Sequence, residues 1–134
     1  MQSQPQRGGF FTIAAWQRAD DLVVKVYEVT DMKTGCFPKH QLYSLVQQFQ
    51  RAAVSVAANI AEGSGRRTLA EYIHFLYIAK GSLTEVEYYI HLANRLGYLS
   101  PAVHQELARL QRMTAGALVG FIRFKETQLA QQGR

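Results

Sequence analysis

Side chains capable of metal binding or catalysis are few in this sequence, and their spacing does not assemble a site. Glu71 and His74 form a Glu-x-x-His string, an arrangement typical of di-iron four-helix proteins. A di-iron site needs a second such string and two further inward carboxylates, which the sequence lacks. Glu71 fits better as the last residue of a Thr68-x-x-Glu71 capping box at a helix start. We therefore expect no metal and no other cofactor.

The remaining histidines and the cysteine do not suggest an active site either. His40, His91 and His104 lie on different segments, and only His91 has a ligand-type partner four residues away, Glu87. One carboxylate and one imidazole do not specify a metal. Cys36 has no recognisable partner histidine for nucleophilic catalysis. The sequence predicts no catalytic residue and no enzyme, with a ligand- or metal-binding bundle enzyme as a minor alternative.

Basic residues supply the candidate binding surface. The chain carries 15 Lys and Arg against 10 Asp and Glu, a formal net charge of +5 that favours anionic partners. The stretch 63–67 puts two arginines just before a predicted helix start, where free backbone amides attract phosphate. A basic stripe on the last predicted helix is the second candidate, for which a solvated face is the alternative. The predicted nucleic-acid contacts are Arg66 and Arg67, followed by Lys80, Arg109, Arg112 and Arg123.

Helical periodicity divides the chain into four segments, at about 14–33, 39–62, 68–96 and 100–127. Prolines and glycines mark their boundaries. Long helices joined by short connections must run antiparallel. The sequence therefore predicts an all-α, antiparallel up-down-up-down four-helix bundle over residues 14–127, with flexible tails at 1–13 and 128–134. On the first helix the predicted core stripe is Trp16, Ala19, Val23, Val26, Tyr27 and Thr30.

The two middle helices carry more apolar surface than the interior of one bundle requires. Small apolar residues form a strip beside the core stripe of segment 39–62, and polar residues follow on the next arc. A subunit interface explains this surplus, and a wide stripe facing two neighbours within one chain is the alternative. The predicted interface residues are Arg51, Val54, Ala58, Asn59, Ala61 and Glu62. In the last segment, Gly116 and Gly120 suggest a notch for close helix packing.

Several protein classes are excluded by composition. A single cysteine rules out a disulfide scaffold and is typical of a reducing compartment, so we expect a cytoplasmic protein. No apolar run follows Arg7, which argues against a secretory signal, and no window approaches the roughly 18 apolar residues of a membrane span. With 48% hydrophobic residues, 134 residues suffice for one domain with a real core.

Several strings together resemble a known family. They include Phe37-Pro38-Lys39, Asn59-Ile60-Ala61-Glu62-Gly63 and Ala79-Lys80-Gly81-Ser82-Leu83, and the match closes on Leu96-Gly97-Tyr98-Leu99. Over residues 14–110 the chain resembles the four-helix bundle family of 23S rRNA-intervening sequence proteins. It departs from the family pattern at Gln50, where many relatives have a second arginine beside Arg51.

The resemblance implies a four-helix bundle that assembles into a ring-like homopentamer. It also implies a link to nucleic acid, because a related group serves as accessory factor to the reverse transcriptase of diversity-generating retroelements. We therefore expect a homo-oligomeric scaffold that binds RNA or DNA, with a reverse transcriptase or another protein as a further partner. A protein–protein adaptor without nucleic-acid binding is the alternative. The resemblance carries over no catalytic residue.

Overall fold

The computed structural model describes residues 7–133, and its regular structure is helical throughout that range. The four long helices are α1 (Ala14–Thr30), α2 (Gln47–Ser64), α3 (Leu69–Arg95) and α4 (Pro101–Gln132). The predicted all-α class with four helices is confirmed. Residues 1–6 and 134 of the two predicted tails lie outside the described residues, and the flexibility of the tails stays a prediction.

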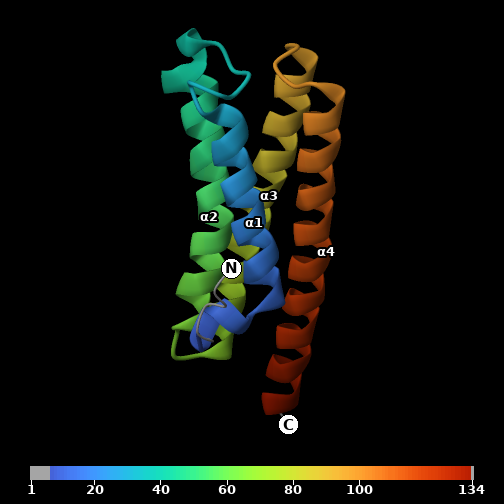
Figure 1. The fold of residues 1–134 in the computed structure, drawn as a ribbon. Coiled ribbons are helices and arrows are strands. Elements are labelled where there is room, and N and C mark those ends of the chain that lie inside the picture. The colour runs from blue at the N-terminus through green and yellow to red at the C-terminus, as the bar shows by residue number, and fades with distance from the viewer. Residues whose placement is uncertain (1–6, 134) are drawn as a thin grey trace.

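The helices pack side by side into an elongated bundle (Figure 1). Consecutive helices are neighbours, and α1 closes the bundle by packing on α4. The connections after α1 and α3 lie at one end of the bundle, and the short turn between α2 and α3 lies at the other (Figure 1). Within residues 7–133, no helix combines the length and the apolar character needed to span a membrane.

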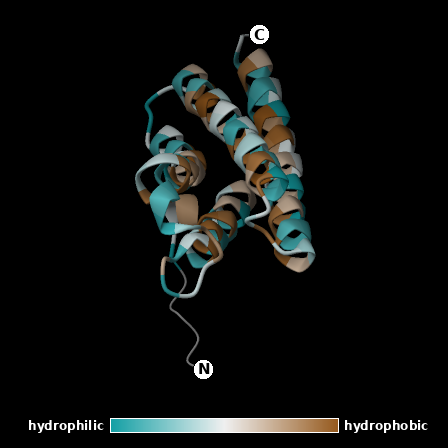
Figure 2. Ribbon diagram, turned by 90° about the horizontal axis from the view of Figure 1, so that it is seen from above, coloured by the Kyte–Doolittle hydropathy of each residue, from teal (hydrophilic) through white to brown (hydrophobic). Residues whose placement is uncertain are grey.

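Each helix is amphipathic, and hydrophobic and hydrophilic residues alternate along all four (Figure 2). The apolar faces meet in one continuous core. Its largest fully buried side chains include Leu22 of α1, Phe49 and Ile60 of α2, Leu76 of α3 and Leu118 of α4. Burial of these side chains is the main force that holds the four helices together.

The buried face of α1 is rotated from the predicted one. Tyr27 was expected in the core, but it is 47% exposed, and Val23 is only partly buried. The buried residues that the prediction missed are Ala15, Leu22 and Val29. Apolar residues occupy well over half of the circumference of α1 between 22 and 29, so periodicity alone could not fix which part of this wide face lies in the core.

Local side-chain chemistry sets the helix ends. The Thr68 hydroxyl accepts a hydrogen bond from the Glu71 amide at 3.1 Å, and the Ser100 hydroxyl accepts one from the Val103 amide at 3.2 Å. These contacts confirm the predicted starts of α3 and α4. The Glu71 carboxylate, however, accepts from the Thr68 hydroxyl at 3.2 Å instead of reaching back to a backbone amide.

Three other boundaries differ from the prediction. Helix α1 ends at Thr30, before 33, because Asp31 adopts an extended conformation and its carboxylate accepts hydrogen bonds from the Thr34 amide and hydroxyl. The predicted helix from Lys39 begins as a 3₁₀ turn (Lys39–Gln41) and a π-helical turn (Leu42–Val46) before α2. Helix α4 continues beyond 127, because residues 128–132 contain neither glycine nor proline.

Candidate nucleic-acid interface

Among residues 7–133, two of the six predicted basic residues form an ion pair with a carboxylate, and the other four do not. Arg66 forms an ion pair with Glu62, and its guanidinium lies 4.5 Å from the centre of the Phe75 ring. Arg109 makes two hydrogen bonds to Glu106, at 2.9 and 2.7 Å. This pairing raises the pKa of Arg109 and lowers that of Glu106. Both arginines are exposed, but each already has an anionic partner.

The other four predicted contacts have no carboxylate within ion-pair distance among residues 7–133. Arg67 is exposed in the turn between α2 and α3, and Arg123 is exposed on α4. Lys80 of α3 lies with its ammonium 5.8 Å from the centre of the Tyr77 ring. Arg112 is exposed on α4. These four cations are therefore the ones available to phosphate groups.

Lys80 and Arg112 line the same groove, between α3 and α4. One part of the groove, about 230 Å³, includes Arg112, and an adjoining part of about 120 Å³ includes Lys80. The two parts adjoin, because Glu87 and Gln111 line both of them. We call the whole the α3–α4 groove; its remaining lining residues are Leu83, Thr84, Ile90, His91, His104, Ala108, Ala115, Leu118 and Val119.

Gln111 is the unusual residue of the α3–α4 groove. Its side chain is 5% exposed and lies on the core face of α4 between Leu107 and Thr114. Its amide has no hydrogen-bond partner among the described residues. Every fully enclosed polar side-chain atom of those residues does have a partner, so the Gln111 amide is not fully enclosed. The small exposed area of this amide therefore opens into the groove, where it can donate and accept hydrogen bonds.

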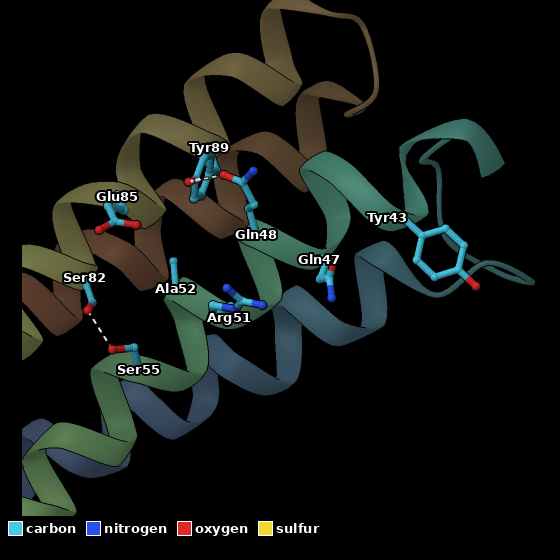
Figure 3. A pocket seen from close by; sticks show the side chains of 9 residues that line it. All are labelled: Tyr43, Gln47, Gln48, Arg51, Ala52, Ser55, Ser82, Glu85 and Tyr89. Carbon is cyan, nitrogen blue, oxygen red and sulfur yellow. Dashed lines mark hydrogen bonds between the residues drawn. The ribbon is translucent and has the colours of Figure 1, made fainter.

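A second groove, of about 390 Å³, lies between α2 and α3 (Figure 3). Two hydrogen bonds join its walls, since Ser55 bonds Ser82 at 2.8 Å and the Tyr89 hydroxyl donates to Gln48 at 2.9 Å. Arg51 contributes to this groove from α2 and Glu85 from α3.

The predicted interface residues lie on the outer side of α2. Val54 is 40% exposed, and Ala58, Arg51 and Glu62 are exposed as well. Ala61 is half-buried. Asn59 is also half-buried and donates to the Ser55 carbonyl at 2.8 Å, so within one chain it braces its own helix. The apolar part of this strip therefore has no covering partner among residues 7–133.

Other sequence features have structural roles. Gln50, which departs from the family pattern, donates to the Thr30 hydroxyl at 2.9 Å and joins α2 to α1. Gly116 and Gly120 are exposed on α4, and no atom of residues 7–133 lies within 4 Å of their missing Cβ positions, so none of the described helices packs into the expected notch. No three His, Cys, Asp or Glu side chains within 7–133 come together as metal ligands.

The grouping of His91, His104, Glu87 and Gln111 in one groove was not predicted from the sequence. A signal for Gln111 was present, because a glutamine at a core position of a helix calls for a hydrogen-bond partner. The two histidines could not be joined from the sequence, since they lie on different helices and meet only through the packing of α3 on α4.

The fold and the groove define a small all-α protein of four packed helices with a basic groove between the last two. The chain belongs to the family of 23S rRNA-intervening sequence proteins, whose family profile matches residues 12–119. The predicted resemblance is therefore confirmed.

Comparison with solved structures supports the fold. The chain is similar to the crystal structure of a protein of unknown function from the S23 ribosomal protein family of Bacteroides thetaiotaomicron. The TM-score is 0.68 at 21% sequence identity, and the alignment covers 81% of this chain and 95% of that one. No curated protein shows a significant match to the chain.

Proposed function

We propose that this protein is a non-enzymatic, cytoplasmic accessory protein that binds RNA or DNA as a ring-like homo-oligomer of antiparallel up-down-up-down bundles. The observation that carries the nucleic-acid part is that Lys80 and Arg112 line one groove from two different helices, and neither has a carboxylate within ion-pair distance among residues 7–133. Phosphate contacts of this kind supply most of the affinity of nucleic-acid binding.

The up-down-up-down arrangement is supported by the positions of the connections, which alternate between the two ends of the bundle (Figure 1). The oligomer is supported by the exposed apolar strip on α2. This strip and the α3–α4 groove do not compete, because α2 packs mainly on α1 and α3 and does not border the groove. We propose five subunits for the ring because the resembling family implies that number.

The nucleic-acid part is tested by measuring fluorescence-anisotropy binding to single- and double-stranded RNA and DNA at about 50 and 200 mM salt. Paired substitutions Lys80→Ala and Arg112→Ala should weaken binding and flatten its salt dependence by about 0.7 to 0.9 per lost phosphate contact. Arg109→Ala is the matched control on the same helix, because Arg109 is already paired with Glu106. An equal loss of affinity in Arg109→Ala and in the Lys80→Ala, Arg112→Ala double variant would contradict the proposal that the groove contacts nucleic acid.

The arginines of the α2–α3 turn are a second test of the same function. Arg67 lacks a carboxylate partner among the described residues, whereas Arg66 is paired with Glu62 and stacked on Phe75. Arg67→Ala should therefore weaken binding more than Arg66→Ala. If neither substitution changes the affinity, this turn is not part of the nucleic-acid contact surface.

A protein–protein adaptor is the second candidate function. It is favoured by a separate exposed patch on α1, where Val24 is 52% exposed and Tyr27 is 47% exposed beside a shallow hollow lined by Glu28, Asp31 and Thr34. Absence of any nucleic-acid binding at 50 mM salt would favour this candidate.

A further inference from the structure

We propose that the α3–α4 groove holds one unpaired base of a single-stranded nucleic acid and prefers a base with an exocyclic amino group. This inference rests on the proposed function and adds the strandedness and the base preference.

The first observation is the Gln111 amide, which belongs to a residue only 5% exposed and has no hydrogen-bond partner among the described residues. Because the amide keeps some exposed area, a polar group that enters the groove can form a hydrogen bond to it. Gln111 lines the larger part of the groove together with Glu87, His91, His104 and Arg112. An amide presents a donor beside an acceptor, and this pair matches the edge of a base.

The size of the groove and the burial of Gln111 argue for a single base. Pockets for drug-sized ligands have volumes of about 300–1,000 Å³, and the larger part of this groove, at about 230 Å³, is smaller. The Gln111 amide lies between two helices, where the edge of a base inside a duplex cannot reach it. An unstacked base of a single strand can insert, and this is how most sequence-specific RNA recognition works.

Glu87 supplies the base preference. It lines both parts of the groove together with Gln111, and its ionised carboxylate can only accept hydrogen bonds. An exocyclic amino group, as in cytosine, donates to such an acceptor, whereas the corresponding carbonyl of uracil is repelled by it. Gln111 can form hydrogen bonds with either base, so Glu87 is the residue that distinguishes cytosine from uracil.

The groups around the groove suit the rest of a nucleotide chain. Tyr88 is 56% exposed on α3 beside His91, with their ring centres 6.4 Å apart and their planes inclined by 34°. Exposed aromatic rings of this kind stack on neighbouring bases. Arg112 and Lys80 lie at separate parts of the groove and can contact phosphates on either side of the inserted base.

The test compares oligocytidylate with oligouridylate of equal length at neutral pH, since cytosine and uracil differ only along this edge. Wild-type protein should bind oligocytidylate about tenfold more tightly, in line with the discrimination of one good base contact. Gln111→Leu should reduce the affinity for oligocytidylate about tenfold. Glu87→Gln should remove the preference and keep oligouridylate binding. Gln105→Leu, at an exposed position of α4, is the matched control and should change neither affinity.

The outcomes separate this inference from the proposed function. Equal binding of the two oligonucleotides by wild-type protein, or duplex binding as tight as single-strand binding, overturns the inference and leaves nucleic-acid binding intact. Absence of binding to any nucleic acid overturns both. Circular dichroism melting of each variant checks folding, and Glu87→Gln, at an exposed position, keeps the test decisive if Gln111→Leu perturbs the core.

Discussion

A Cβ atom placed on Gly63, near the end of α2, would lie 2.9 Å from the Cβ atom of Phe75 in α3. It would also lie 3.0 Å from a ring carbon of Tyr72. Real Cβ atoms do not approach neighbours this closely, so α2 and α3 can meet here only because residue 63 lacks a side chain. This contact gives a physical reason for the glycine that ends the Asn-Ile-Ala-Glu-Gly string of the sequence.

Gly63→Ala should therefore lower the stability of the bundle by about 1–3 kcal/mol, the usual cost of overpacking a well-packed site. Gly116→Ala is the matched control, because nothing lies near its missing Cβ and alanine favours a helix by about 0.5–1 kcal/mol over glycine. Urea denaturation followed by circular dichroism measures both. If Gly63→Ala and Gly116→Ala changed the free energy of unfolding by similar amounts and in the same direction, the close contact at Gly63 would be contradicted.

The Thr30 hydroxyl links α1 to α2 and offers a second stability test. It is buried, donates to the Val26 carbonyl at 2.7 Å and accepts from Gln50 at 2.9 Å. Thr30→Val keeps the shape but leaves the Gln50 amide without this acceptor, so we expect a loss of about 1 kcal/mol. In the double variant with Gln50→Leu, part of this loss should be recovered. Fully additive effects in denaturant melts would show that the two residues are not coupled.

Alkaline pH should weaken one contact between α3 and α4. The Tyr77 hydroxyl donates to Glu126 at 2.9 Å, and this hydrogen bond raises the pKa of Tyr77 above its ordinary value of 10.0. Because the folded-state pKa is raised, the contact stabilises the bundle fully below about pH 10, and this contribution is lost as pH rises through the raised pKa.

Ultraviolet titration of tyrosinate measures this effect, with Tyr77→Phe identifying the phenol among the seven tyrosines. Glu126→Gln removes the carboxylate charge and should lower the Tyr77 midpoint toward about 10. An unchanged midpoint in Glu126→Gln would show that the carboxylate does not control this phenol.

The proposed oligomer is tested at Ala58, in the exposed strip on α2. Ala58→Glu would bury a charge in the subunit interface and should yield a folded helical monomer, because an unpaired buried charge is strongly unfavourable. Ala130→Glu, at an exposed position of α4, is the control. Light scattering coupled to size exclusion gives the mass of each. An oligomer of native mass from Ala58→Glu would exclude this strip as the interface.

Most of the fold could be predicted because its signals are local. The caps at Thr68 and Ser100 and the helix stop before Gly97 are each encoded within a few residues. The buried face of α1 could not be predicted, because its apolar residues cover well over half of the helix circumference and only the packing of the neighbouring helices selects the buried part. The end of α4 was placed too early because Gln-rich composition suggested a tail, although those residues are good helix formers.

The candidate site could be predicted only in part. Lys80 and Arg112 were named from their charge, but their convergence depends on how α3 packs on α4. The pairing of Arg109 with Glu106 follows a helical spacing of three residues and was readable in advance, whereas Arg66 lies beyond the end of α2 and reaches Glu62 only because of how the turn folds. The groove residues Glu87 and Gln111 come together only through the tertiary structure.

The π-helical turn at Leu42–Val46 marks a place where the chain can change length. A π turn accommodates one residue more than an α turn over the same rise. Deleting one residue from 42–46 would convert this turn to α-helix and leave the heptad-like register of Phe49, Val56 and Ile60 untouched. The same deletion after Phe49 would rotate every preceding side chain of the helix by about 100° out of the core. Natural length variation in this helix should therefore be confined to its first turns.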